Sequence, residues 1–144
     1  MPPPVDRLWR QWDRFSRSVQ IPSRDEGLIR FAPFGTQSYL IREILAGIER
    51  GVHEFCILKP RQVGASTVLM IFTLFWLLKH QGLQGALVTE TDKTKEYLRG
   101  SFGKIHASLP TRFTYPATAN NRYGIQWAHG SRLVYETAGV RKNT

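Results

Sequence analysis

With 144 residues and 42% apolar side chains, the chain can bury one hydrophobic core but is too short for two ordinary domains. Its formal charge of +9 favours a polyanionic partner, of which nucleic acid is the first candidate, although a basic surface also promotes solubility. The single cysteine, Cys56, excludes a disulfide framework and a cysteine-based zinc site. No segment has the pattern of a signal peptide or a membrane span, so we expect a soluble intracellular protein.

The first predicted element is a basic amphipathic helix close to the N-terminus. Arginines alternate with an apolar stripe at helical spacing, which is formed by Val5, Leu8, Trp9, Trp12 and Phe15. Two interpretations stay open. The stripe can dock on the rest of the domain and leave the arginines solvated, or the helix can contact DNA or a partner protein.

Residues 21–34 are predicted to be irregular because two prolines and a glycine interrupt them. Their adjacent acids, Asp25 and Glu26, follow no apolar strand, so we interpret them as a solvated loop pair. Residues 36–50 are then predicted to form a helix, with apolar residues on one side and Gly51 at the stop position.

Gln37 stands near the start of this predicted helix. A glutamine amide can pair with the N6 and N7 edge of adenine, which phosphate contacts cannot read. An isolated glutamine at a helix start can equally be ordinary polar surface. Both interpretations of Gln37 stay open.

The most informative stretch is a loop between a predicted core strand at residues 54–58, in which Cys56 is expected to be buried, and a predicted buried helix at residues 66–80. Such a loop suits phosphates because the helix N-terminus offers unpaired N–H groups and the positive end of a dipole. A glycine in the loop lets the backbone approach an anion closely. The loop consists of Lys59, Pro60, Arg61, Gln62, Val63, Gly64, Ala65, Ser66 and Thr67.

This loop matches the phosphate-binding pattern G-x-x-x-x-G-K-[ST] in part. Gly64 takes the position of the second glycine, and Ser66 takes that of the magnesium-binding hydroxyl. Ala65 replaces the lysine, whereas Lys59 stands where the first glycine should be and can reach phosphates from the opposite rim. The alternative is an ordinary turn in which Gly64 eases the bend and Ser66 or Thr67 caps the helix.

The next segment predicts more of a parallel sheet. Residues 86–89 form a predicted strand, which completes a strand–helix–strand unit with residues 54–58. A helix at residues 93–108 follows, with Asp92 as its predicted N-cap. Because ligands gather beyond the carboxyl ends of parallel strands, residues 89–92 are expected at the same edge as the loop. The basic residues of this helix contact DNA or, in the interpretation that we favour, form its solvated face; they are Lys93, Lys95, Arg99 and Lys104.

In the last part of the chain the hydrophobic period changes to two. This pattern predicts short strands at residues 112–118, 122–128 and 131–137, with tight turns at residues 120–121 and 129–130. The whole pattern predicts an α/β fold with a parallel sheet, flanking helices and an antiparallel hairpin near the C-terminus.

The pattern Lys59-x-Arg61-x-x-Gly64-x-Ser66 resembles the deviant Walker A loop of the large terminase subunits of tailed bacteriophages, the ATPases that drive viral DNA into procapsids. In that family the lysine often opens the loop, and an Arg-Gln or Arg-Val pair precedes the glycine. Residues 31–37 resemble the adenine-reading element found upstream of the P-loop in terminases and superfamily 2 helicases, an aromatic or proline residue followed by glutamine.

A further resemblance lies at residues 129–132, which are similar to the Asn-Gly-Ser-Arg hairpin of many terminases, with His129 in place of the asparagine. The resemblance as a whole implies a RecA-like P-loop NTPase fold. It covers residues 31–144 and implies that they form the N-terminal portion of the ATPase domain, whereas residues 1–30 contain the predicted basic helix and a linker. Since no apolar strand ending in Asp-Glu follows, we expect an incomplete domain without the Walker B strand or the nuclease domain.

The resemblance also implies roles for the loop residues. Lys59 neutralises phosphate charge, and Arg61 stabilises charge in the transition state. Gly64 and its neighbours cradle the phosphates through backbone N–H groups. Ser66 ligates Mg²⁺, and Gln37 reads adenine. The implied cofactors are ATP and Mg²⁺, and we expect this chain alone to bind ATP weakly with little or no turnover.

The implied partners are double-stranded DNA, the small terminase subunit and the portal protein, without a membrane. The implied setting is a homo-oligomeric ring in the host cytoplasm, transiently at the procapsid portal. Two other functions stay open. The chain can be a fragment of a superfamily 2 helicase-like translocase, or a non-enzymatic basic DNA-binding phage protein in which Gly64 and Ser66 only form a turn. The latter would bind DNA with steep salt dependence and ignore ATP.

Overall fold

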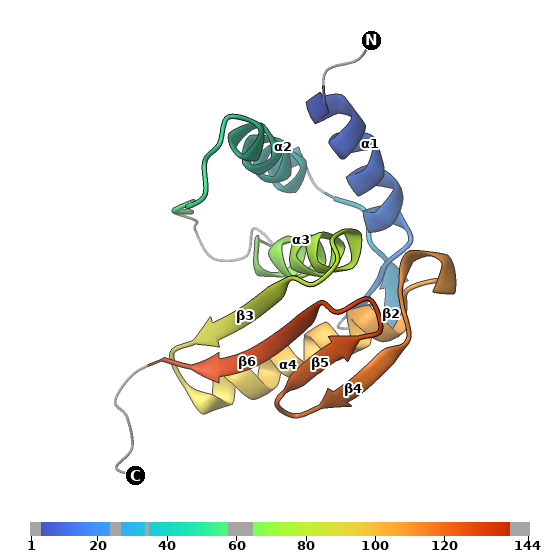
Figure 1. Cartoon of the computed structure of the whole chain (residues 1–144), viewed down its shortest axis with the longest axis vertical. Helices are drawn as coiled ribbons and strands as arrows, with labels where there is room; N and C mark the ends of the chain where they lie inside the picture. Colours follow the sequence, from blue (N-terminus) through green and yellow to red (C-terminus); the bar gives the residue numbers. More distant parts are fainter. Residues whose placement is uncertain (1–3, 24–26, 34, 58–64, 139–144) are drawn as a thin grey trace.

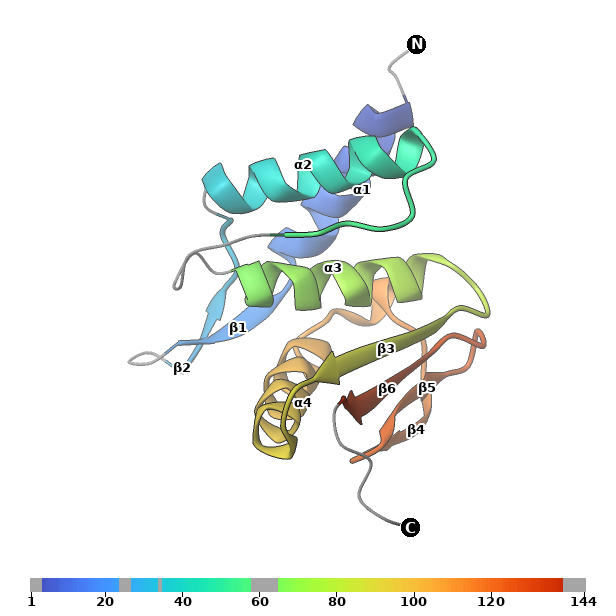
Figure 2. The same cartoon turned by 90° about the vertical axis from the view of Figure 1, so that its left-hand side faces the viewer.

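The polypeptide stacks helices and a small mixed sheet in layers (Figures 1 and 2). The computed structural model describes residues 4–23, 27–33, 35–57 and 65–138. Helices α1 (Pro4–Arg17) and α2 (Gly35–Glu49) lie on one side of α3 (Ala65–Lys79), and the sheet and α4 (Asp92–Ala107) lie on the other. The remaining elements are β1 (Gln20–Ser23), β2 (Gly27–Arg30), β3 (Gln84–Thr89), the 3₁₀ turn η1 (Thr111–Phe113), β4 (Ala117–Asn121), β5 (Gly124–Trp127) and β6 (Arg132–Thr137).

The larger sheet has the strand order β3-β6-β5-β4. Strands β3 and β6 are parallel, with Gln84 opposite Arg132 and Thr89 opposite Thr137, whereas the other two pairs are antiparallel. The α/β class and the antiparallel hairpin near the C-terminus are confirmed. The sheet is mixed, however, so the expectation of a parallel sheet holds only for this one pair of strands.

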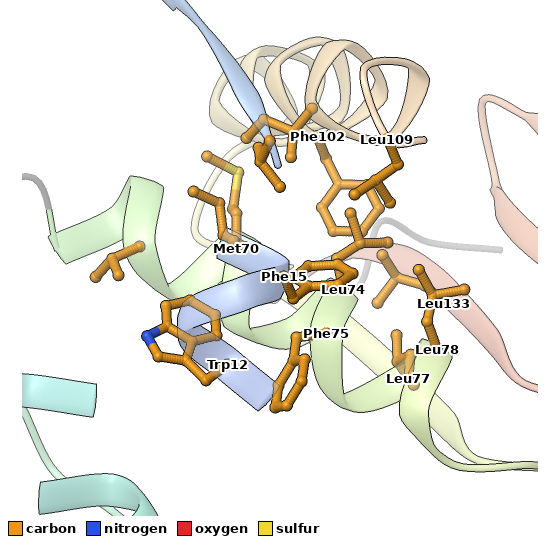
Figure 3. Close-up of a cluster of buried hydrophobic side chains, with 14 of the residues drawn as sticks. Trp12, Phe15, Met70, Leu74, Phe75, Leu77, Leu78, Phe102, Leu109 and Leu133 are labelled. Atoms are coloured by element: carbon orange, nitrogen blue, oxygen red, sulfur yellow. The ribbon is translucent and has the colours of Figure 1, made fainter. Parts of the chain in front are cut away.

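Helix α3 is the centre of the hydrophobic core (Figure 3). Apolar side chains surround it almost completely, which is typical of a helix covered on all sides. Ile71 and Leu74 are fully buried. Trp12 of α1 meets Phe75 edge-on at 5.6 Å between ring centroids, and Phe15 lies 5.4 Å from the same ring. The docked interpretation of the N-terminal aromatic stripe is therefore confirmed.

Helices α3 and α4 both cover the same face of the sheet. Leu133 and Tyr135 of β6 are buried on this face, and Phe102 of α4 contacts the Tyr135 ring edge-on at 6.3 Å. On either side of this pair along the strand, Arg132 and Glu136 point to the opposite face and are exposed. The alternation follows from the two-residue period of a strand. One face of the sheet thus builds the core.

The predicted strand at residues 54–58 is wrong for the residues that the structure describes. Residues 52–57 have no regular secondary structure, and Cys56 is exposed instead of buried. The segment runs back along α2, because the N–H of Val52 donates to the carbonyl of Gly47 at 2.8 Å and the Phe55 ring lies against Gly47. Short apolar runs do not distinguish a strand from other buried backbone. The predicted strand–helix–strand unit is therefore not formed by these residues.

Residues 21–34 are more regular than predicted, since β1 and β2 form an antiparallel hairpin. Pro22 lies opposite Leu28 in this two-stranded sheet. Proline has no backbone N–H to donate, but both strands are edge strands, where proline is tolerated. The hydroxyl of Ser108 accepts from the Gln20 N–H at 2.9 Å and fixes the hairpin to α4. The acidic pair at residues 25–26 lies outside the described residues.

The C-terminal strands differ from the prediction in their boundaries. Residues 111–113 form η1, and the strand begins only at Ala117, so the predicted strand at residues 112–118 is wrong for most of its length. The hairpin turn is at Arg122-Tyr123, because the side-chain oxygen of Asn121 accepts from the Tyr123 N–H at 2.8 Å. Asn121 therefore precedes the turn and stabilises it, whereas the prediction placed Asn120 and Asn121 within the turn itself.

Candidate functional site

The start of α3 is the candidate site to which the sequence points. The helix begins at Ala65, and the first N–H groups of any helix have no partner within it, so this end attracts anions. Ser66 is exposed in the first turn, and Thr67 beside it is half-buried. An exposed hydroxyl at this place suits a ligand of Mg²⁺, which prefers oxygen donors. The predicted residues Lys59, Pro60, Arg61, Gln62, Val63 and Gly64 lie outside the described residues.

A hollow of about 120 Å³ lies beside this helix end. Ser66 and Thr67 form part of its wall, Pro22 of β1 closes a second side, and Tyr97 and Ser101 of α4 form a third. The Tyr97 side chain is 72% exposed, so its ring is accessible from solvent. The hollow thus combines the aliphatic hydroxyls of Ser66, Thr67 and Ser101 with the accessible phenol ring of Tyr97.

The carboxyl end of β3 lies on the same side of the molecule as the start of α3 (Figure 2). Thr89 is buried at this strand end, and its hydroxyl donates to the Thr91 carbonyl at 3.0 Å. The Thr91 hydroxyl then accepts from the Thr94 N–H at 3.2 Å, so Thr91 is the N-cap of α4. The prediction of Asp92 as N-cap is wrong by one residue, because Asp92 already belongs to the helix.

The carboxylates near this strand end have different surroundings. Glu90 is exposed, whereas Asp92 accepts a hydrogen bond from the Thr137 hydroxyl at 2.6 Å and lies 3.7 Å from the Lys95 ammonium. Asp92 therefore joins the end of β6 to the start of α4. Among the residues that the structure describes, no three histidine, cysteine or acidic side chains converge as a metal site. Of the predicted site residues, Ser66, the predicted ligand of Mg²⁺, is described by the structure and lies in the first turn of α3.

Gln37 lies in the first turn of α2 and is only 4% exposed. Its interpretation as ordinary polar surface is therefore wrong. Helices α2 and α3 both begin on the side of the molecule to which β3 points (Figure 2). The role of Gln37 as an adenine reader stays a prediction.

Two of the basic residues of α4 form ion pairs with acidic residues of the same helix. Lys95 pairs with Asp92, and the guanidinium of Arg99 lies 2.8 Å from Glu96. Lys93 is exposed, without an ion pair among the described residues. Such pairs are typical of a solvated helix face, which is the interpretation that we favour.

The turn at residues 129–130 has a structural role that the sequence did not reveal. The His129 ring donates from Nε2 to the Leu77 carbonyl at 2.9 Å, because a carbonyl can only accept. The hydroxyl of buried Ser131 donates to the His80 carbonyl at 2.6 Å and accepts from the Leu83 N–H at 3.0 Å. These bonds satisfy backbone groups where α3 ends and the chain turns into β3. The only sequence signal was the predicted tight turn itself.

No protein-family model matches the chain, and no curated protein matches it either. Among the described residues, no helix is both long and apolar enough to cross a bilayer.

Proposed function

We propose that the chain is a nucleotide-binding part of a DNA-packaging ATPase similar to the large terminase subunits of tailed bacteriophages. The observation that carries the proposal is Ser66, which is exposed in the first turn of α3 and follows the sequence pattern of residues 59–64 directly along the chain. The buried helix behind it gives a rigid support. Phosphoryl transfer depends on positioning and electrostatics, which the helix start and a lysine from the preceding residues would provide together.

The proposed roles follow the chemistry of each residue. Lys59 and Arg61 neutralise phosphate charge, Gly64 permits close approach of the backbone, and the Ser66 hydroxyl ligates Mg²⁺. Gln37 recognises adenine. ATP would supply the reactive phosphate when bound, while these residues bind and orient it. We propose double-stranded DNA, a small terminase subunit and a portal protein as partners, with several copies in a ring.

Weak turnover is part of the proposal. Hydrolysis needs one acid that holds magnesium through water and a base that orients the attacking water. Close to the end of β3, Asp92 is held by Thr137 and Lys95, and Glu90 is exposed, with no hydrogen bond or ion pair of its side chain among the described residues. We therefore expect ATP binding without efficient hydrolysis by this chain alone.

The test is binding of a fluorescent ATP analogue with Mg²⁺ to the wild type, Lys59→Ala and Ser66→Ala. Matched controls are Lys93→Ala on the exposed side of α4 and Ser38→Ala in α2. We expect both loop variants to lose at least about tenfold in affinity, as removal of a charge-assisted phosphate contact does, while the controls bind like the wild type. Steady hydrolysis that is insensitive to Lys59→Ala would contradict the proposed role of the loop.

A second function is favoured by one observation, the absence of a strand at the described residues 52–57 before the loop. In a non-enzymatic basic DNA-binding protein, Gly64 and Ser66 would only form a turn. A folded wild-type chain that ignores the ATP analogue and binds DNA with steep salt dependence would favour this function.

A further inference from the structure

A second hollow lies at the opposite end of α3 from Ser66. Its volume is about 380 Å³, at the lower end of the range for ligand pockets. It opens between α1, α3 and η1, and we refer to it as the basic pocket. Leu78 and Lys79 mark its position one helix length from Ser66, or roughly 20 Å at 1.5 Å per residue. It is therefore separate from the proposed nucleotide site.

The floor of the basic pocket is apolar and rigid. Phe15, Phe75 and Leu78 are each at most 5% exposed. The Phe113 ring meets Phe15 edge-on at 5.8 Å, so α1 and η1 hold each other in place around the hollow. Binding of an apolar side chain over such a floor is favourable, because it removes apolar surface from water.

The rim of the basic pocket carries three cations and, within the described residues, no acid. Arg14, Lys79 and Arg112 line it, and all three are exposed. None of them belongs to an ion pair among the described residues. The Lys79 ammonium donates to the neutral amide oxygen of Gln11 at 2.6 Å, which orients the charge without cancelling it. The positive rim is therefore available for anionic groups.

We propose that the basic pocket binds an acidic peptide segment of a partner protein, with one aromatic or leucine side chain inserted over the floor and carboxylates on the rim. An apolar anchor surrounded by charges of the opposite sign is the usual composition of a peptide interface. A nucleic acid fits less well, because stacking of bases needs free aromatic faces. The Arg112 guanidinium covers the Phe113 ring at 4.8 Å, and His129 stacks on Tyr115 at 4.1 Å.

The experiment measures fluorescence anisotropy of a short labelled peptide that carries one Trp between two Glu-Asp pairs. Companion peptides replace Trp by Leu or Ala, and a further one replaces the acids by Lys. We expect the Trp and Leu peptides to bind, and the Ala and Lys peptides to bind at least about fivefold more weakly, which is the order expected for loss of one anchor or of several surface charge pairs.

Charge reversal then locates the site. Arg14→Glu and Arg112→Glu should each weaken the Trp peptide about three- to tenfold, whereas Arg10→Glu, an equal charge change on an exposed residue of α1, should have little effect. All three variants should fold normally by circular dichroism.

Failure of both anchored peptides to bind, or equal effects of Arg10→Glu and Arg14→Glu, would overturn the proposal. Binding of a labelled oligonucleotide that is lost in Arg14→Glu and Arg112→Glu but not in Arg10→Glu, without peptide binding, would assign the pocket to nucleic acid instead. Because no nucleotide enters this experiment, its result is independent of the proposed ATP site.

Discussion

The indole N–H of Trp127 donates to Nε2 of His106 at 3.0 Å and thereby joins β5 to α4. Since Nε2 accepts this bond, the His106 ring is neutral and carries its proton on Nδ1. Trp127 is 2% exposed, so water cannot easily replace the bond. Protonation of Nε2 would remove the acceptor and place a charge against a buried indole.

This contact predicts that stability falls in mild acid. Burial lowers the pKa of His106 below its ordinary value of 6.5, so the unfolded chain binds the proton more readily than the folded chain. The stabilisation is fully present above pH 6.5 and is lost as the pH falls from there towards the folded pKa. Burial, assisted by the Lys79 charge, also lowers the pKa of His80 and acts in the same direction.

Urea unfolding of the wild type and His106→Gln between pH 7.5 and 5 should show a shallower pH dependence in the variant. A control variant, His53→Gln at an exposed position, should keep the wild-type dependence. Identical slopes for His106→Gln and the wild type would contradict the prediction.

Ser131→Ala should destabilise the fold by about 1–3 kcal/mol, the cost of leaving buried polar groups without partners. The variant removes the acceptor of the Leu83 N–H and the donor to the His80 carbonyl, and Ser131 is 0% exposed. Chemical denaturation measures the effect. Ser38→Ala, which removes a half-buried hydroxyl from α2, is the control and should change stability by less than half as much. Equal losses in the two variants would show that the cap of α3 is unimportant.

Gly124→Ala and Gly100→Ala should have opposite effects on stability. A Cβ on Gly124 would collide with the backbone carbonyl of Leu133 in the neighbouring strand, which cannot yield without moving β6. We expect a loss of about 1–3 kcal/mol or more, as for other overpacked sites. Gly100 in α4 is exposed, with open space around its Cα, so alanine should stabilise the helix by about 0.5–1 kcal/mol. Midpoints of thermal unfolding compare the two. A Gly124→Ala variant as stable as the wild type would mean that the close approach of β5 and β6 is not required.

Trp12→Ala should destabilise the fold more than Trp9→Ala, the other tryptophan substitution on α1. Trp12 is 1% exposed and contacts Phe72 and Phe75, so its removal should cost about 3–5 kcal/mol. Trp9 is half-buried under the Arg42 guanidinium at 4.1 Å, and Trp9→Ala should cost clearly less. Denaturation of both variants provides the comparison. If Trp12→Ala left the stability of the whole domain unchanged, α1 would be an independent appendage rather than part of the core.

The sequence alone determined the elements that have long periodic patterns. The aromatic stripe of α1 and the one-sided pattern of α2 recur at helical spacing over several turns, and the apolar run of α3 is too long for an ordinary strand, so each identifies a helix. The same holds for β5 and β6, where alternation separates a buried face from an exposed one. The phosphate-binding role of residues 59–67 stays a prediction, which depends on a glycine and a hydroxyl close to the start of a helix.

Only the tertiary structure decided which strands pair and which polar groups become buried. Residues 52–57 pack along α2 instead of joining the sheet, and β3 pairs with β6, which is more than forty positions away in the printed sequence. Local patterns contain no information about such distant partners. The same reason explains why the cap formed by His129 and Ser131, the neutral state of His106 and the three cations of the basic pocket were not predicted. Each depends on side chains from separate elements that meet only after the chain has folded around α3.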